Sequence, residues 1–397
     1  MGGSPRVAVV VLAGGRSRRF GTDKLAYEVA GRSLLAYTLD ALPVDVDVYL
    51  VGPPRPASRP LVIVREDPPG GGPAAALVCG LTAALEGGAD LIATLPGDAP
   101  EAGSAAMLLL DRLRSESAPT AVVGVDPDGR EQPLQLALTR TAAAQIITGA
   151  GPTRGDGQSA RALLRALQPP AARCAVDESA VFDIDDHNHL TAWQLAHSPA
   201  IEDVRSAIER RRGADRRQRL VVAIDGPSCA GKSILATALR LRTSATLIEG
   251  DDFYGTDLPS RTAMEREAMS DAEVAAAVVD WQRLRDQALS PLAAGRPARF
   301  QPYDWSADDG SLAAERVLRP ADLIIVEGVY SARPELADLV DLAIHLDVDP
   351  ELRIRRYAER GNDPEWTRLW ERAEAFYFAR VRPPESFDLR LQSPEVS

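Results

Sequence analysis

The sequence predicts an α/β protein of two domains, each built on a sheet of mainly parallel strands. Runs rich in Val, Ile and Leu alternate with Ala- and Leu-rich stretches along both halves of the chain, the pattern typical of parallel strands covered by helices on both faces. In each half one apolar run leads directly into a glycine-rich turn, at Gly14 and at Gly226. A chain of 397 residues is long enough for two domains with separate cores.

The strands are expected where short apolar runs end at turn residues. In the first half these runs are 7–12, 46–51, 61–64, 91–95 and 121–125, and in the second half they are 220–224, 245–249, 323–326 and 342–346. Charged residues without apolar spacing follow residue 200, as expected of a solvated connector. A basic run of this kind also suits contact with an acidic partner. We expect domains at 1–199 and 218–397, a charged linker at 200–217 and a boundary near Gly213.

The composition excludes several classes of function. A net charge of −12, from 45 Lys and Arg against 57 Asp and Glu, argues for small phosphorylated ligands held locally and against nucleic acid as a partner. No segment reaches the ~18 continuous apolar residues of a membrane helix. Cys79, Cys174 and Cys229 have no C-x-x-C spacing, so we expect reduced thiols in a cytoplasmic protein, without disulfide or zinc. The oligomeric state is left open.

The first glycine turn is followed by cations. After the run 7–12, the pair Gly14 and Gly15 lets main-chain N–H groups approach phosphate oxygens, and the start of the next helix adds a favourable dipole. The cations that follow supply the positive charge that a triphosphate requires; they are Arg16, Arg18, Arg19 and Lys24.

Two later elements complete a candidate nucleotide site. The turn 67–77 contains Gly70-Gly71-Gly72 and is either a loose turn or a platform for a flat base. Asp98 follows a strand and is either a helix cap or a Mg²⁺ ligand. His187 and His189 lie beside acidic turn residues, and without a third ligand we interpret them as solvent-exposed rather than metal-binding.

With these motifs in view, residues 5–195 resemble the molybdenum-cofactor guanylyltransferases and related nucleotidyltransferases. The resemblance is carried by L-A-G-G-x-S-x-R-x-G-x-D-K at 12–24, G-P-x-A-x-L at 72–77, P-x-D-x-P at 96–100, Gln132-Pro133-Leu134 and Phe182-Asp183-Ile184-Asp185. It implies a Rossmann-like sheet, Mg²⁺, and GTP or another NTP as substrate. It also implies a nucleotide site formed by Leu12, Ala13, Gly14, Gly15, Arg19, Lys24, Gly72 and Pro73, with Asp98 and Asp185 as metal ligands and Lys24 and Asp98 as catalytic residues. Phe20 and the turn 185–188 depart from the usual family residues, so the acceptor is a molybdopterin, another phosphorylated cofactor precursor or a sugar phosphate.

The second glycine turn, residues 226–233, satisfies G-x-x-x-x-G-K-S in full. In this motif the loop amides surround the β-phosphate, the lysine spans the β- and γ-phosphates, and the hydroxyl coordinates Mg²⁺. By their positions in the motif, Lys232 is the lysine and Ser233 supplies the hydroxyl. Cys229 lies within the loop and is interpreted as a small space-filling residue rather than a redox group.

Three later features favour a kinase over other proteins with this loop. Asp251 follows the next strand and can take a proton from an acceptor hydroxyl. Glu327 ends a buried strand near the expected Mg²⁺ position. The segment 352–361 carries four arginines, which suit a lid over the transferred phosphoryl group or, alternatively, a solvated helix face.

With these features in view, residues 218–392 resemble uridine kinases and phosphoribulokinase-like enzymes. The resemblance is carried by D-x-F-Y at 251–254, Pro302-Tyr303-Asp304-Trp305, V-E-G at 326–328 and R-R-x-x-E-R-G at 355–361. The resemblance implies a parallel P-loop kinase sheet and ATP with Mg²⁺. It implies nucleotide contacts from Gly226, Ser228, Ala230, Gly231, Lys232 and Ser233, metal ligands Ser233 and Glu327, catalytic residues Asp251, Lys232, Arg355 and Arg360, and acceptor contacts from Asp252, Tyr254 and Tyr303. Asp252 is the alternative base, and Tyr303 and Trp305 are alternatively core aromatics. Acidic Asp308 stands where uridine kinases place a base-reading His, which argues against uridine.

The sequence therefore predicts a bifunctional enzyme, a Mg²⁺-dependent nucleotidyltransferase fused to an ATP-dependent small-molecule kinase. Because a nucleotidyltransferase needs a phosphate acceptor and a kinase makes one, the kinase product is a candidate substrate for the first domain. Two alternatives remain: two unrelated activities on one chain, and a single active kinase whose transferase-like domain binds nucleotide only to regulate it.

Overall fold

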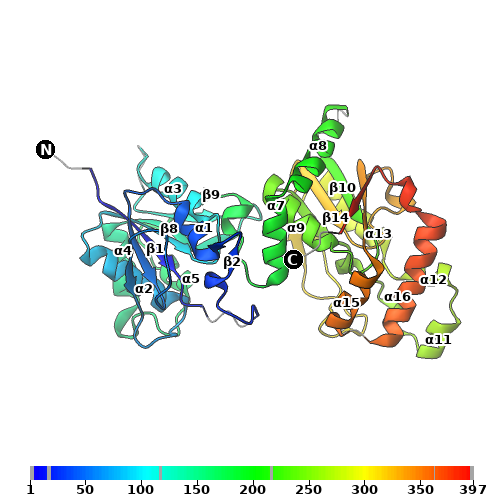
Figure 1. Ribbon diagram of the computed structural model, residues 1–397, viewed down its shortest axis with the longest axis horizontal. Coiled ribbons are helices and arrows are strands. Elements are labelled where there is room, and N and C mark those ends of the chain that lie inside the picture. Colours follow the sequence, from blue (N-terminus) through cyan, green and yellow to red (C-terminus); the bar gives the residue numbers. More distant parts are fainter. Residues whose placement is uncertain (1–3, 16–18, 116–118, 215–217, 362, 394–397) are drawn as a thin grey trace. The chain divides into compact units, whose positions relative to one another are not determined.

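The chain folds into two compact α/β units. The computed structural model describes residues 4–15, 19–115, 119–214, 218–361 and 363–393, so Arg16 and Arg18 of the first loop lie outside the described residues. One unit comprises Met1–Leu190 and the other Thr191–Ser397 (Figure 1). Within the described residues, no helix is both long enough and apolar enough to cross a membrane.

The first unit contains a seven-stranded sheet in the order β5-β4-β1-β6-β8-β7-β9. Its strands are β1 (Val7–Leu12), β4 (Asp47–Val51), β5 (Val62–Val64), β6 (Leu91–Pro96), β7 (Ala121–Val125), β8 (Glu131–Thr139) and β9 (Ala172–Ala175), and a separate pair is formed by β2 (Glu28–Val29) and β3 (Arg32–Ser33). Its helices are α1 (Leu34–Asp40), α2 (Pro73–Glu86), α3 (Ala102–Leu113), α4 (Arg140–Gly149), α5 (Ala160–Arg165), α6 (Glu178–Val181) and the short η1 (Lys24–Ala26) and η2 (Gly151–Thr153), while α7 (His187–Ala196) continues into the second unit.

Strand β8 breaks the parallel pattern, because it pairs antiparallel with both β6 and β7. The cause is the short turn 126–130, in which Asp126 N–H donates to Arg130 O at 3.0 Å and Gly129 has φ +84°. So short a connection can join only antiparallel strands. All nine predicted strands form, but β8 and β9 were not among them.

Alternation along β1 explains why both faces of this sheet are covered. Ala8 and Val10 pack into a core with α2, α4 and α5, whereas Val9 and Val11 pack into a second core with α1, α3 and α6. Because successive side chains of a strand point to opposite faces, an uninterrupted apolar run is the sequence of a strand buried on both sides.

The second unit contains a five-stranded, fully parallel sheet in the order β11-β14-β10-β15-β16. Its strands are β10 (Leu220–Asp225), β11 (Thr246–Glu249), β14 (Leu323–Glu327), β15 (Leu342–Asp347) and β16 (Leu389–Gln392), with a separate hairpin of β12 (Ala298–Phe300) and β13 (Arg316–Leu318). Its helices are α8 (Pro199–Ala214), α9 (Lys232–Thr243), α10 (Asp257–Ser260), α11 (Ala263–Ala268), α12 (Asp271–Ala277), α13 (Trp281–Arg283), α14 (Ser290–Ala293), α15 (Pro350–Arg360) and α16 (Pro364–Phe376), with short turns η3 (Gly250–Phe253), η4 (Leu284–Leu289), η5 (Pro334–Leu336), η6 (Tyr377–Val381) and η7 (Pro384–Ser386).

The segment expected to be a linker is largely helical. Residues 199–214 form α8, whose buried Ile201, Val204 and Ile208 repeat at helical spacing. Two of its arginines, Arg205 and Arg212, pair with glutamates three residues earlier. This apolar stripe was not recognised in the sequence because charged residues are dense in the segment. The chain passes from the first compact unit to the second between Leu190 and Thr191, and the predicted domain limits stay a prediction.

Parallel pairing places a carboxylate beside each glycine loop. In the first unit Leu12 lies opposite Pro96, so the loop after β1 lies next to Gly97 and Asp98. In the second unit Ile224 lies opposite Glu327 itself. The carboxyl ends of neighbouring parallel strands form one edge of the sheet, where α/β proteins bind their ligands.

Buried Asp225 ties the second glycine loop to the rest of its unit. The fully buried carboxylate accepts hydrogen bonds from the N–H groups of Gly226 (2.8 Å), Tyr330 (3.1 Å) and Ala332 (3.0 Å) and from the hydroxyl of Tyr377 (2.8 Å). Burial raises its pKa, although these bonds and Lys232 act in the opposite direction. The carboxylate joins the start of the loop to the segment after β14.

We expect Tyr377→Phe to lower the free energy of unfolding by about 2 kcal/mol, because it removes a hydrogen bond to a buried charged group. Urea unfolding measures the change. Tyr37→Phe is the control, since that hydroxyl donates to the neutral carbonyl of Val29 at 3.1 Å and its loss should cost less. Equal effects of the two substitutions would contradict a special role for Asp225.

Candidate functional site

The first loop is held from the adjacent strand and from the proline-rich loop 53–60. Ala13 N–H donates to Val51 O at 2.8 Å, and Arg55 donates to Ala13 O at 2.9 Å while pairing with Asp23. Backbone packs closely here, because a Cβ on Gly52 would lie 2.6 Å from Ala13 O. No motif in the sequence singles out Arg55, which lies among prolines and whose side chain is 6% exposed.

Lys24 lies between two carboxylates. Its Nζ is 2.6 Å from Asp98 and 3.0 Å from Asp185, and Arg19 approaches Asp185 at 3.2 Å. Burial by itself would lower the pKa of Lys24, but the two carboxylates outweigh it and the pKa is raised. Four of the predicted residues therefore gather at one point beside the loop, with the lysine charged.

The carboxylates are placed by separate segments. Asp98 does not cap α3, whose N-cap is Glu101, so its position agrees with the ligand interpretation rather than the cap. The Ile184 N–H donates to Asp98 O at 2.9 Å, which brings Asp185 to the same edge. No group of three or more His, Cys, Asp or Glu suited to a metal occurs within the described part of the chain. Exposed His187 instead stacks on Phe20 with ring centroids 4.4 Å apart.

Gly72 and Pro73 begin α2. Gly72 is the N-cap with φ +92°, a conformation that favours glycine, and no side chain of the described residues caps the helix. Its first-turn N–H groups are thus left for a ligand or water. Just before it, buried Glu66 accepts a hydrogen bond from Gly70 N–H at 3.0 Å. The structure thus gives this glycine turn a defined shape.

The second loop, 226–233, passes from β10 into α9. Lys232 is buried and donates to Pro227 O at 3.0 Å, and Ser233 Oγ donates to Glu327 Oε1 at 3.1 Å. The hydroxyl and the carboxylate are the hard oxygen ligands that Mg²⁺ prefers. Their spacing fits the predicted pair of metal ligands.

Two acids near this loop have raised pKa values. Burial, with Asp251 nearby, raises the pKa of Glu327 to about 7. Burial also raises the pKa of Asp252 to about 6, although Arg316 lies 2.7 Å away and acts in the opposite direction. Asp252 is therefore engaged by an arginine, whereas Asp251 is exposed.

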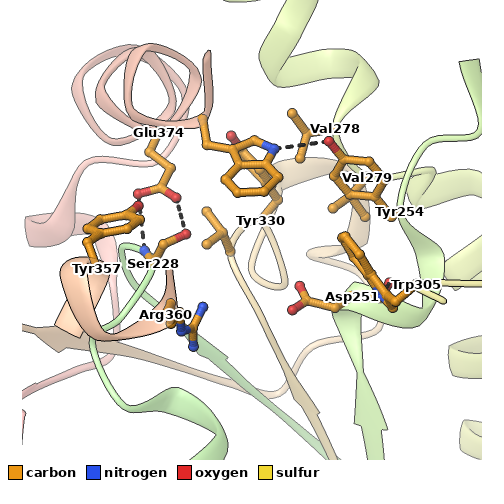
Figure 2. A pocket seen from close by; sticks show the side chains of 12 residues that line it. Ser228, Asp251, Tyr254, Val278, Val279, Trp305, Tyr330, Tyr357, Arg360 and Glu374 are labelled. Atoms are coloured by element: carbon orange, nitrogen blue, oxygen red, sulfur yellow. Dashed lines mark hydrogen bonds between the residues drawn. The ribbon is translucent and has the colours of Figure 1, made fainter. Parts of the chain in front are cut away.

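A cavity of about 340 Å³ opens beside the loop (Figure 2). Asp251 lies on one side, and Ser228 with Arg360 lies on the other. The full lining is Ser228, Asp251, Tyr254, Val278, Val279, Trp305, Val329, Tyr330, Tyr357, Arg360, Trp370 and Glu374. The phosphate loop, one carboxylate and one arginine therefore face a space large enough for a small acceptor.

Aromatic side chains form one wall of this cavity. Tyr254 contacts Tyr303 and Trp305 with ring centroids 5.1 and 5.0 Å apart, and Trp370 donates to its hydroxyl at 3.0 Å. Tyr303 is buried behind this wall and donates to Asp308 at 2.9 Å, whereas Trp305 is 45% exposed. Tyr303 is thus buried as the core alternative has it, whereas Trp305 lines the cavity, and the acceptor contact of Tyr303 stays a prediction.

The arginines of α15 divide into two groups. Arg353 and Arg356 donate to the carbonyls of Ser228 and Cys229, at 3.2 and 2.9 Å. Arg360 lines the cavity, and Arg355 is exposed and does not line it. The predicted roles of Arg355 and Arg360 stay predictions. Arg353 and Arg356, recognised from the sequence only as part of the arginine-rich segment, are the two that clamp the loop.

Two sequence-family profiles match the chain, one in each half. A MobA-like NTP transferase domain matches residues 9–172, and the phosphoribulokinase / uridine kinase family matches residues 221–374. The chain thus has an NTP-transferase-like domain and a uridine-kinase-like domain, and it is an enzyme with features of both classes. The two predicted resemblances are confirmed.

Individual relatives match the second half most clearly. A uridine kinase of Lactiplantibacillus plantarum is 30% identical over 173 residues, which are 42% of this chain and 79% of that protein. One of Halobacterium salinarum is 31% identical over 142 residues, but the match spans only 61% of that protein and 35% of this chain.

Solved structures resemble each half. A possible uridine kinase from Bacillus stearothermophilus has 24% identity and a TM-score of 0.36, covering 48% of this chain and 99% of its own. Molybdopterin-guanine dinucleotide biosynthesis protein A from Archaeoglobus fulgidus has 17% identity and a TM-score of 0.37, covering 46% and 94%. The family assignment rests on the sequence matches.

The raised pKa of Glu327 predicts a pH-dependent stability. The folded protein holds this proton up to about pH 7, whereas an unfolded glutamate loses it near its ordinary pKa of 4.5. The contribution of Glu327 to the free energy of unfolding is therefore most favourable below pH 4.5, and it falls by up to about 3 kcal/mol as the pH rises through 7. We expect Glu327→Gln to gain stability relative to the wild type between pH 5 and pH 8 in urea unfolding. A difference that does not change with pH would contradict this.

Proposed function

The chain belongs, through residues 221–374, to the phosphoribulokinase and uridine kinase family, and we propose that it is a bifunctional enzyme. Its second domain transfers the γ-phosphoryl group of ATP to the hydroxyl of a small molecule. Its first domain transfers NMP from an NTP, with GTP the first choice, to a phosphorylated cofactor precursor. Both reactions use Mg²⁺.

One observation carries the kinase proposal: Ser228 of the phosphate loop and Asp251 line the same cavity. An acceptor hydroxyl in that cavity lies between a base and the end of the loop. Asp251 takes the hydroxyl proton as the oxygen attacks phosphorus and the bond to the β–γ bridging oxygen breaks. Lys232 and Arg360 balance the charge on the transferred group. Ser233 and Glu327 would hold Mg²⁺, which would supply further charge stabilisation.

The acceptor of the kinase is proposed to differ from uridine. Asp308 is held by the Tyr303 hydroxyl, and an ionised carboxylate accepts hydrogen bonds but donates none. Asp308 does not line the cavity, so an acceptor group that reaches it from there would have to offer an N–H or O–H donor. The aromatic wall and two valines of the cavity suit an acceptor with an apolar part.

The transferase proposal depends on the cluster around Lys24. Lys24 lies charged between Asp98 and Asp185. These two acids would hold a Mg²⁺ ion, which would supply charge stabilisation at the triphosphate. In the reaction the acceptor phosphate attacks the α-phosphorus and pyrophosphate leaves, and Lys24 and Arg19 neutralise the departing charge.

Label transfer tests both activities on the full chain. With a small-molecule cell extract as the source of acceptors, we expect [γ-³²P]ATP and [α-³²P]GTP each to label a product. Lys232→Ala should lower ATP labelling at least 100-fold and leave GTP labelling unchanged, and Lys24→Ala should do the reverse, since each cation stabilises charge at only one site. If Lys24→Ala changes kinase activity instead and no GTP-derived product forms, the first domain is regulatory.

The choice of base is tested by comparing two neighbours. We expect Asp251→Asn to lower kcat for the labelled acceptor by roughly 10²–10⁴-fold with little change in KM for ATP, as for loss of a general base. Asp252→Asn should have a smaller effect, because Asp252 is paired with Arg316. The reverse order of effects would assign the base to Asp252.

A further inference from the structure

A carboxylate from α16 occupies the tip of the second loop. Glu374, only 4% exposed, accepts hydrogen bonds from the N–H of Ser228 at 3.1 Å and from its hydroxyl. Arg353 donates to the same carboxylate at 2.8 Å. A loop amide, a hydroxyl and a guanidinium are donors that proteins also use to bind phosphate oxygens. Glu374 therefore accepts hydrogen bonds from groups of the kind that bind phosphate.

The position of Glu374 places its carboxylate where it would compete with the phosphates of a bound nucleotide. It lines the cavity together with Ser228, Asp251 and Arg360 (Figure 2), on the path by which the γ-phosphoryl group would reach an acceptor. Like charges that accept from the same donors repel each other. The carboxylate and the end of a triphosphate cannot share these donors without cost.

We propose that Glu374 is an internal anion that holds the tip of the phosphate loop while no nucleotide is bound and that competes with the triphosphate for Ser228 and Arg353. The inference rests on the proposed kinase function. When the nucleotide displaces Glu374, the guanidinium of Arg353 becomes available to the phosphates.

The same helix links this exchange to the acceptor wall. Trp370 lies four residues before Glu374 on α16, and so on the same side of the helix, and its indole N–H donates to Tyr254 at 3.0 Å. The contact with the phosphate loop and the contact with the aromatic wall therefore lie on one face of α16.

Calorimetric titration of the full chain with AMP-PNP and Mg²⁺ tests the competition. We expect Glu374→Gln, which keeps the shape but removes the charge, to lower the Kd of the second-domain site about tenfold, or about 1.4 kcal/mol. Glu371→Gln is the matched control: it makes the same change of charge on an exposed position of the same helix and should leave the Kd unchanged. Glu374→Ala should also bind more tightly, and thermal unfolding verifies that each variant is folded.

The outcomes separate this inference from the function on which it rests. The second-domain site is the one at which Lys232→Ala abolishes binding of AMP-PNP. If Lys232→Ala abolishes no AMP-PNP binding, the kinase proposal itself fails. If Lys232→Ala abolishes that binding but Glu374→Gln binds the analogue as the wild type does, or more weakly, the competition is overturned. Weaker binding would make Glu374 a residue that positions the loop.

Discussion

Parallel pairing of the strand before each glycine loop is the constraint on which both sites depend. In the first unit β1 pairs with β6, and in the second β10 pairs with β14. These pairings bring Asp98 and Glu327, each about 85–100 residues from its loop in the sequence, to the edge where the loops begin. Without this register the loops would keep their glycines but would lose the neighbouring carboxylate.

Both sites balance their acids with nearby cations, but in different ways. In the first unit Lys24 lies between two carboxylates and its pKa is raised. In the second unit Glu327 is buried beside a serine and its pKa is raised to about 7, while Glu374 is paired with Arg353. Each arrangement is one that bound phosphate and Mg²⁺ would change, because they bring charges larger than those of the side chains.

The sequence predicted the parts of the fold that follow from local pattern. The nine apolar runs and the two loops were identified because a buried strand followed by a glycine turn has a distinctive composition. Strand β8 was missed because Glu131, Gln132 and Pro133 begin it with polar and strand-breaking residues. The helix α8 was missed because its charges outnumber its apolar positions.

Within the sites, the predicted residues lay on motifs, and the missed ones did not. Arg55, Arg353 and Glu374 act through contacts with residues 42, 125 and 146 positions away. No spacing rule connects such positions, because they meet only after the sheet has formed. From the sequence, Asp251 was expected to be the base and Asp252 the alternative, and only the structure shows that Asp252 is paired with Arg316 while Asp251 lines the cavity.

Counting the nucleotide sites on one chain tests the central claim most directly. The four NTPs are titrated with Mg²⁺ into the wild-type protein and into Lys232→Ala. Two independent sites predict that ATP binding at one site is lost in the variant while GTP binding persists with unchanged Kd. Loss of all nucleotide binding in Lys232→Ala would contradict a working site in the first unit, and the chain would then be a kinase with a non-catalytic transferase-like domain.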